Sequence, residues 1–173
     1  SEEHFSQLIA ELEQTIPGTG SLRERMSTFR AQFIIPPDRL EKVISRAMQK
    51  CREKTIAHVE LPPGENVRLN ITNDMPWVGF TEFRGNSQST VHLNSSVPVH
   101  IERAIELGCH EGYPGHHVHA SLVEQKLVKA RGWIEYAYIA LVGPSAVIAE
   151  GAASYAMDVA FSREERIEFE RDI

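Results

Sequence analysis

The sequence predicts an α+β fold that is mostly helical, with a small three-stranded sheet, antiparallel or mixed, in its middle. Three observations predict it. Apolar residues recur at helical spacing through the first sixty residues, alternate with polar residues between positions 67 and 94, and return to helical spacing from Pro98 onward. The 173 residues, 42% of them hydrophobic, are enough to bury a core of their own.

The first sixty residues, 1–60, are expected to form a helical N-terminal segment. Its first helix begins with a serine followed by two glutamates and runs until Pro17. The second opens with a capping box, Ser21 with Glu24 three residues later. A long third helix is expected to start with Asp38 as its cap. Its inward residues are expected to be Leu40, Ile44, Ala47, Met48 and Cys51.

Residues 61–161 are expected to form the core. Its three strands are predicted at residues 67–71, 77–83 and 90–94, with a Gly-Asn-Ser turn between the last two. Helices follow the sheet, interrupted by Pro-Gly and Gly-Pro pairs. Residues 162–173 form a charged helical stretch without an end cap. We therefore expect a piece of a longer chain or one subunit of a larger assembly, the alternative being a complete small domain with frayed ends.

Charge and composition exclude several partners. The formal net charge is −6, so the surface is not suited to coat nucleic acid or an anionic membrane. No stretch reaches the roughly 18 apolar residues of a membrane span, and the N-terminus lacks the pattern of a signal peptide, which favours the cytoplasm. Cys51 and Cys109 are far apart in the sequence, so neither a disulfide framework nor a thiol-rich zinc site is expected. Cys109 is expected to be a small buried helix residue.

Histidine is concentrated in one segment. Five of the eight histidines fall within twenty residues, from His100 to His119, and four of them lie in the run CHEGYPGHHVH. A histidine followed directly by glutamate, with another histidine within two turns, is the pattern of the zinc peptidase helix, whose usual form is HExxH. There the ligands at i and i+4 share a face, and the glutamate turns toward the attacking water. Here position i+4 is Pro114, which cannot bind a metal.

Pro114 and Gly115 decide whether the two histidines can still bind one metal ion. In an unbroken helix His110 and His117 would share a face but lie about 10.5 Å apart, whereas two nitrogens bound to one zinc lie within roughly 3.5 Å of each other. Pro114 removes a helical hydrogen bond and Gly115 permits unusual backbone angles, so a local bulge is expected. If the bulge absorbs two residues, His116 becomes the second ligand beside His110. Whether His117 takes that place instead is left open.

A third ligand is expected from the apolar helix PSAVIAEGAASYA. Glu150 is a lone carboxylate among small apolar residues, and such a group is costly to bury unless it is paired or coordinated. The small residues at positions 151–153 would let this helix approach closely. Two imidazoles, one carboxylate and a position for water form a catalytic zinc shell, so Zn²⁺ is the expected cofactor. For His110 and Glu111 alone, the alternative is a polar patch on a surface helix.

The run CHEGYPGHH, followed by VIAEGAASYA, resembles the domain-of-unknown-function 885 family of bacteria and archaea. Its members carry a His-Glu-x-x-Pro-Gly-His-His signature with a downstream Glu-Gly-x-Ala, are commonly longer than this chain, and are similar to the gluzincin metallopeptidases. The resemblance implies a gluzincin-like core with His110, His116 and Glu150 as metal ligands and Glu111 as general base and acid. It also implies that the strand at residues 90–94 is the sheet edge on which an extended substrate lies.

These residues together predict a zinc-dependent hydrolase, a metallopeptidase that acts on a peptide or small amide. The tyrosines could donate to a developing oxyanion, and Tyr155 ranks first because it lies five residues beyond Glu150. Asp158, two turns beyond Glu150, either orients a ligand imidazole or forms a surface ion pair. His117 and His119 are expected to support the ligands or to face solvent.

Two other functions remain open at this point. The first is a non-catalytic or degenerate peptidase-like module that binds peptides or a partner subunit, or a fragment of a larger enzyme that is inactive by itself. The length of the chain favours it, whereas an intact Glu111 argues against it, since a binding domain has no need of a general base. The second is metal-assisted hydrolysis of a non-peptide amide or ester, which uses the same activated water.

Overall fold

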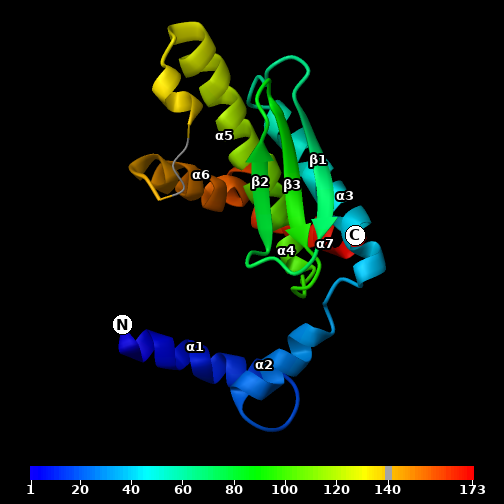
Figure 1. Ribbon diagram of the computed structural model, residues 1–173. Helices are drawn as coiled ribbons and strands as arrows, with labels where there is room; N and C mark the ends of the chain where they lie inside the picture. The colour runs from blue at the N-terminus through cyan, green and yellow to red at the C-terminus, as the bar shows by residue number, and fades with distance from the viewer. Residues whose placement is uncertain (139–141) are drawn as a thin grey trace. The chain divides into compact units, whose positions relative to one another are not determined.

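The computed structural model describes residues 1–138 and 142–173. These residues form helices and a small three-stranded mixed sheet, so the predicted α+β class is confirmed (Figure 1). The chain divides into two compact units, Ser1–Ile34 and Ile35–Ile173. The division falls after residue 34, whereas the sequence suggested a helical segment up to residue 60, because the third helix belongs to the core of the second unit.

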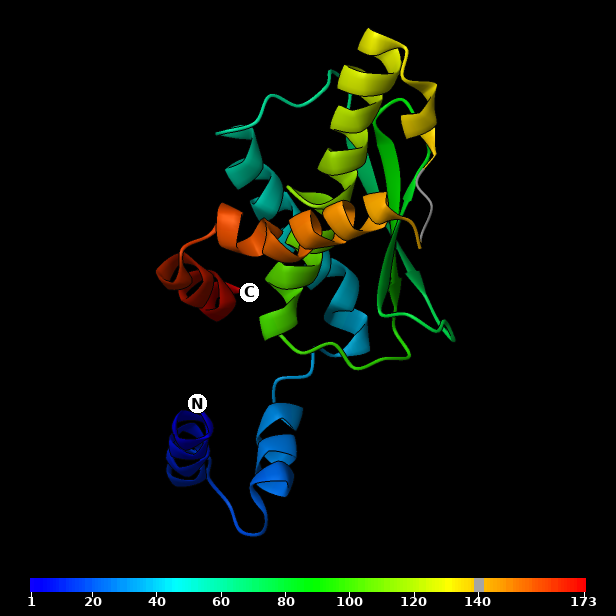
Figure 2. The same cartoon turned by 90° about the vertical axis from the view of Figure 1, so that its left-hand side faces the viewer.

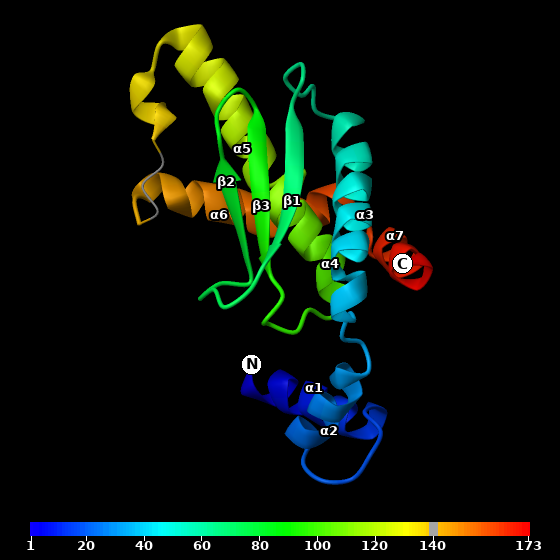
Figure 3. The same cartoon turned by 45° about the vertical axis from the view of Figure 1, so that its right-hand side comes forward.

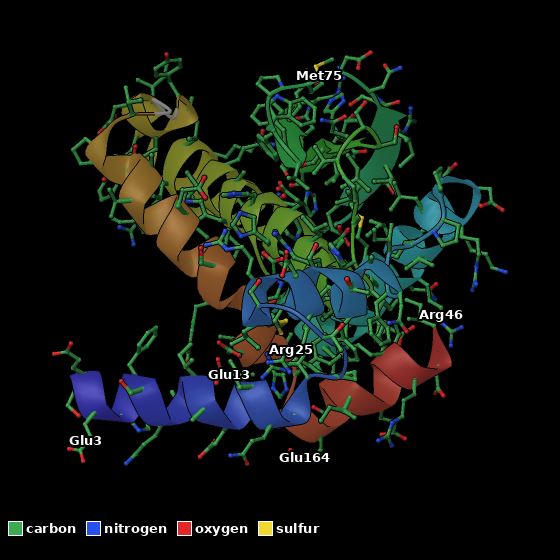
Figure 4. All side chains as sticks on the ribbon, turned by 90° about the horizontal axis from the view of Figure 1, so that it is seen from below. Glu3, Glu13, Arg25, Arg46, Met75 and Glu164 are labelled. Atoms are coloured by element: carbon green, nitrogen blue, oxygen red, sulfur yellow. A yellow bond between two sulfur atoms is a disulfide. The ribbon has the colours of Figure 1, made fainter. Side chains whose placement is uncertain are left out.

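The first unit consists of α1 (Glu2–Thr15) and α2 (Leu22–Ala31), close to the two predicted helices. The expected capping box at the start of α2 is present: Ser21 accepts a hydrogen bond from the backbone three residues on, and the glutamate there accepts one from the backbone of Ser21. The guanidinium of Arg25 donates to the carbonyl oxygen of Glu13 at 2.8 Å (both are labelled in Figure 4). This bond satisfies an unpaired carbonyl near the end of α1.

α3 (Pro37–Ile56) is the long helix of the second unit. It begins at Pro37, and Pro36 occupies the cap position without a side-chain hydrogen bond, so the prediction that Asp38 caps the helix is wrong. Proline suits the first helical position because it has no N–H to leave unpaired. Asp38 instead adds negative charge to the first turn. The buried face includes every residue predicted to point inward and consists of Leu40, Val43, Ile44, Ala47, Met48, Cys51 and Thr55.

The sheet contains β1 (Asn66–Thr72), β2 (Gly79–Phe83) and β3 (Gln88–Asn94), close to the three predicted segments. β3 is central: it runs parallel to β1 and antiparallel to β2. The expectation that residues 90–94 form a sheet edge is therefore wrong, because the edges belong to β1 and β2. The predicted turn between β2 and β3 is present, with positive φ at Gly85, Asn86 and Ser87.

The helices of the second unit lie on one side of the sheet (Figure 2). After β3 the chain forms α4 (Glu102–Leu107), a π-helical turn η1 (Gly108–Gly112), α5 (His116–Val123), a π-helical turn η2 (Glu124–Lys129), a 3₁₀ turn η3 (Ile134–Ala137), α6 (Pro144–Ala160) and α7 (Arg163–Asp172). Figure 3 shows α3 beside β1, with α5 behind β2 and β3. Within the described ranges, no helix is both long enough and apolar enough to cross a bilayer.

α7 packs on α3. Phe169 of α7 is buried, and the guanidinium of Arg46, labelled in Figure 4, lies 5.9 Å from the centre of its ring. Lys54, near the end of α3, forms an ion pair with Glu165. These contacts join the charged segment at residues 162–173 to α3 within the second unit.

α3 and η1 pack with their backbones close together. A Cβ atom added at Gly108 would lie 3.0 Å from the backbone nitrogen of Met48. Cys51 of α3 and Cys109 of η1, both fully buried, form a disulfide across this contact. The expectation of no disulfide is therefore wrong, because the fold makes neighbours of two cysteines that are 58 residues apart in the sequence. The disulfide holds the segment that carries the histidines against α3.

Candidate metal centre

His110 and His116 come together at a break in the helical segment. His110 lies in η1, the chain then turns through a cis peptide bond between Tyr113 and Pro114, and α5 begins at His116. The two imidazole rings meet edge to face, with their centres 4.7 Å apart. The break expected at Pro114 and Gly115 is thus present, and it places His116 next to His110 across an interruption that a straight helix could not provide.

Gly115 lies at the tightest point of this break. A Cβ atom at this position would overlap the carbonyl oxygens of Cys109 and His110. The amide of Gly115 donates a hydrogen bond to the carbonyl of Cys109 at 2.9 Å, which fixes the approach of the two segments. Glycine is required here because of this close backbone contact.

Glu150 reaches both histidines from α6, which runs across the η1 and α5 segments (Figures 1 and 2). Its Oε2 lies 3.5 Å from Nε2 of His110, and its Oε1 lies 3.4 Å from Nε2 of His116. α6 approaches through small residues, of which Ala149 and Ala153 are buried. The Glu150 side chain itself is 62% exposed, so burial does not force it into coordination as the sequence suggested. Its position, rather than its burial, makes it a candidate ligand.

His110, His116 and Glu150 form a group that could hold a metal ion, because their ligand atoms all lie within 4.8 Å of one another. Two ligands bound to one zinc at about 2.0–2.1 Å lie roughly 3.5 Å apart in a tetrahedral shell. The observed N···O distances of 3.4 and 3.5 Å match that separation. Burial, together with the neighbouring His110, lowers the pKa of His116, which favours the neutral ring that can bind a cation. The residue types and these two distances therefore fit a metal-binding group.

Glu111 follows the first histidine and is held by β2. Its side chain is buried, and Oγ1 of Thr81 donates a hydrogen bond to its Oε2 at 2.6 Å. A Cβ atom at Gly79 would lie 2.8 Å from Oε1 of Glu111, so glycine makes room for the carboxylate. Burial raises the pKa of Glu111, whereas the bond from Thr81 acts against this shift. A carboxylate with a raised pKa and a fixed orientation is suited to accept and return a proton.

The candidate ligands border an open cleft of about 460 Å³, which we call the metal cleft. Each of the five residues of β2 lines it, and so do residues of α5 and α6. Glu111 and His119 are also in its wall. Burial lowers the pKa of His119, which favours a neutral imidazole in the cleft wall one turn beyond His116.

His117, the residue after the second candidate ligand, takes part in a buried polar network. Its Nε2 lies 3.0 Å from Oε2 of Glu65, and its Nδ1 lies 2.8 Å from Oγ of Ser89. Oε2 of Glu65 also accepts a hydrogen bond from the hydroxyl of Tyr113 at 2.6 Å, and its Oε1 pairs with Arg52 at 2.6 Å. His117 therefore supports the helix break, whereas the structure brings His116 to Glu150.

No sequence pattern marks Glu65, although it is central to this network. Its side chain is only 3% exposed. Burial acts to raise the pKa of this carboxyl, but hydrogen bonds from Tyr113, Arg52 and His117 outweigh burial, so the pKa lies below its usual value. Tyr113 and His117 flank the break on its two sides. Glu65 thus ties both sides of the break to one buried charge, an arrangement that only the folded chain reveals.

The other predicted site residues lie away from the cleft. Tyr155 is 62% exposed on α6 and is not among the described residues that line the metal cleft. Its role as an oxyanion donor stays a prediction. Asp158 lies 3.3 Å from Arg166, the surface ion pair that was one of its two expected roles.

Comparison with protein-family models, with curated proteins and with solved structures finds no match to this chain. The resemblance carried by the two motifs therefore stays a prediction. The geometry by itself supports a candidate metal-binding group formed by His110, His116 and Glu150.

Proposed function

We propose that this chain is a zinc-dependent hydrolase of the gluzincin-like type, a metallopeptidase in which Glu111 is the general base. One observation carries the proposal. His110, His116 and Glu150 converge from η1, α5 and α6, and the buried carboxylate of Glu111 lies in the wall of the same open cleft. The two motifs that resemble the domain-of-unknown-function 885 family are the ones that meet there.

The proposed chemistry is hydrolysis of an amide bond by water. A zinc ion held by His110, His116 and Glu150 would polarise the scissile carbonyl and lower the pKa of a water molecule. Glu111 takes a proton from the attacking water and returns it to the leaving amine as the C–N bond breaks. Thr81, by its hydrogen bond, keeps this carboxylate oriented.

β2 offers a place for an extended peptide. It is an edge strand, and its consecutive residues from Gly79 to Phe83 all line the metal cleft. Side chains of a strand alternate between its two faces, so a strand whose consecutive residues line one cavity meets that cavity with its edge. Unpaired backbone groups at such an edge can add a peptide as a further strand. This assignment replaces the central strand β3, which the family resemblance implied.

A non-catalytic metal-binding module is the second candidate, and a specific observation favours it. Among the described residues that line the cleft, no tyrosine, lysine or arginine is present to stabilise an oxyanion. His119 would have to supply that hydrogen bond. The two candidates differ in turnover, because a binding module takes up zinc and peptide without hydrolysis.

The metal site is tested by measuring zinc in the purified protein. His110→Ala and Glu150→Ala should lose bound zinc, whereas His58→Ala, which changes an exposed histidine outside the cleft, should keep it. Full zinc occupancy in both ligand variants would contradict the assignment.

The general base is tested by Glu111→Gln, assayed on a peptide library and on simple amides and esters. This variant should keep its zinc and lose about 100-fold or more of its turnover. Undiminished hydrolysis would remove Glu111 from the mechanism. Zinc uptake by the unaltered protein without any hydrolysis would favour the binding module, and hydrolysis of esters or non-peptide amides alone would change the substrate class.

A further inference from the structure

A second hollow, of about 300 Å³, adjoins the metal cleft, and we call it the side pocket. It shares three lining residues with the cleft: Phe83, Ala120 and Ala137. Its remaining wall comes from α5, η2, η3 and the turn between β2 and β3. The two hollows therefore lie next to each other at these shared residues.

The wall of the side pocket is mainly apolar. Besides the three shared residues it includes Val123, Val128 and Tyr136. Glu124 is the charged residue among the described lining residues, and its carboxylate already has hydrogen-bond and ion-pair partners. Oε1 and Oε2 of Glu124 accept the backbone amides at positions 86 and 87 at 2.8 and 3.0 Å, and Lys129 lies 3.3 Å from Oε2. The pocket thus offers no free carboxylate to a basic ligand.

The distance from the candidate metal ligands to the side pocket suits an extended peptide. Ala120 follows His116 by four residues on the same helix, which corresponds to about 6 Å along the axis. An extended peptide advances roughly 3.3 Å per residue. A side chain within two residues of the scissile bond can therefore enter the side pocket while the scissile carbonyl lies at the candidate metal ligands.

We propose that the side pocket binds an apolar side chain, such as leucine or phenylalanine, within two residues of the scissile bond. This inference rests on the proposed hydrolase function and adds the substrate class. An apolar cavity of roughly 150 Å³ already holds a benzene molecule, so a hollow of about 300 Å³ has room for one large side chain. Serine, aspartate or lysine at the same peptide position would leave the apolar wall uncovered.

Binding is tested first without catalysis. N-acetyl-leucinamide, N-acetyl-serinamide and N-acetyl-lysinamide are titrated into the full chain, and the amide signals of Val123 and Val128 are followed by NMR. The leucine compound should bind about tenfold or more tightly than the other two and shift these signals. Equal binding of the three compounds, or tighter binding of the lysine compound, would overturn the inference whether or not the protein hydrolyses peptides.

Hydrolysis is tested next with peptides that differ in one side chain within two residues of the cleavage position. The leucine and phenylalanine peptides should be cleaved with a kcat/KM about 10- to 200-fold above that of the serine peptide. Cleavage of all peptides with equal kcat/KM would leave the hydrolase standing and refute the side pocket. Leucinamide binding at Val123 and Val128 without cleavage of any peptide would refute the hydrolase and support the side pocket as a binding site.

Variants locate the selectivity in the molecule. Tyr136→Ser removes an exposed aromatic wall, so the fold is kept and the leucine preference should fall several-fold. Tyr138→Ser is the matched control, because Tyr138 is 79% exposed and lies outside both hollows. Ala120→Leu should fill the pocket and abolish binding of the leucine compound. An unchanged preference in Tyr136→Ser together with unchanged leucinamide binding in Ala120→Leu would overturn the assignment.

Discussion

Glu65→Ala tests how the break between the two candidate ligand histidines is held. Glu65 is the shared acceptor for Tyr113, His117 and Arg52, and every one of these groups is a donor. The Arg52 side chain is 46% exposed and can find water after the change. The Tyr113 hydroxyl and the His117 ring are buried, and each unsatisfied donor costs about 1–3 kcal/mol. We therefore expect the free energy of unfolding to fall by about 3–5 kcal/mol.

Glu65→Gln separates the loss of charge from the loss of an acceptor. The amide keeps one oxygen for Tyr113 and His117 but no longer pairs with Arg52, so the expected loss is only about 1–2 kcal/mol. Glu53→Ala is the control, because Glu53 forms an exposed ion pair with Lys50 on the same helix and should cost less than about 1 kcal/mol. Urea unfolding measures all three, and zinc affinity should fall on the order of tenfold in Glu65→Ala.

The pH dependence of stability gives an independent reading of the same carboxyl. The pKa of Glu65 in the folded chain lies below its usual value of 4.5, so its ionised form stabilises the fold. That contribution is complete above the unfolded pKa and is lost as pH falls through the folded one. The unaltered protein should therefore lose stability more steeply below pH 4.5 than Glu65→Gln does. Parallel pH curves, or a cost of Glu65→Ala no larger than that of Glu53→Ala, would refute this role of Glu65.

Three further predictions concern the break, the disulfide and the general base. Gly115→Ala should weaken zinc binding by about tenfold or more in a competition with a chromogenic chelator, because a Cβ there overlaps backbone oxygens; Gly151→Ala, where a Cβ meets nothing within 4 Å, should bind zinc normally. The Cys51–Cys109 disulfide closes a loop of 58 residues in the unfolded chain, so its reduction should lower the free energy of unfolding by about 4 kcal/mol in urea. An unchanged midpoint after complete reduction, verified by thiol titration, would contradict this prediction. Gly79→Ala should displace the carboxylate of Glu111, so hydrolysis should fall about tenfold or more while bound zinc is kept. Turnover equal to that of the unaltered protein would show that the contact between Gly79 and Glu111 does not position the general base.

The periodic parts of the fold were predictable because each depends on residues close together in the sequence. The capping box at Ser21 and Glu24 is such a local signal, and so is the alternation that marks β1. The start of α3 was misplaced by two residues because Asp38 is a good cap and Pro37 a good first residue, and local propensity alone does not choose between them. Strand order was beyond such reasoning, since alternation identifies a strand without identifying its partner.

The sequence by itself determined which residues could form the site. Proline and glycine after His110 predict an interrupted helix, and the interruption offers His116 as the neighbour of His110. Tertiary structure decided the rest, because those contacts join residues far apart in the chain. α6 brings Glu150 to the histidines, Glu65 ties the two sides of the break together, and β2 rather than β3 borders the cleft. A spacing rule describes one helix, whereas a metal site also needs the packing that brings a second segment to it.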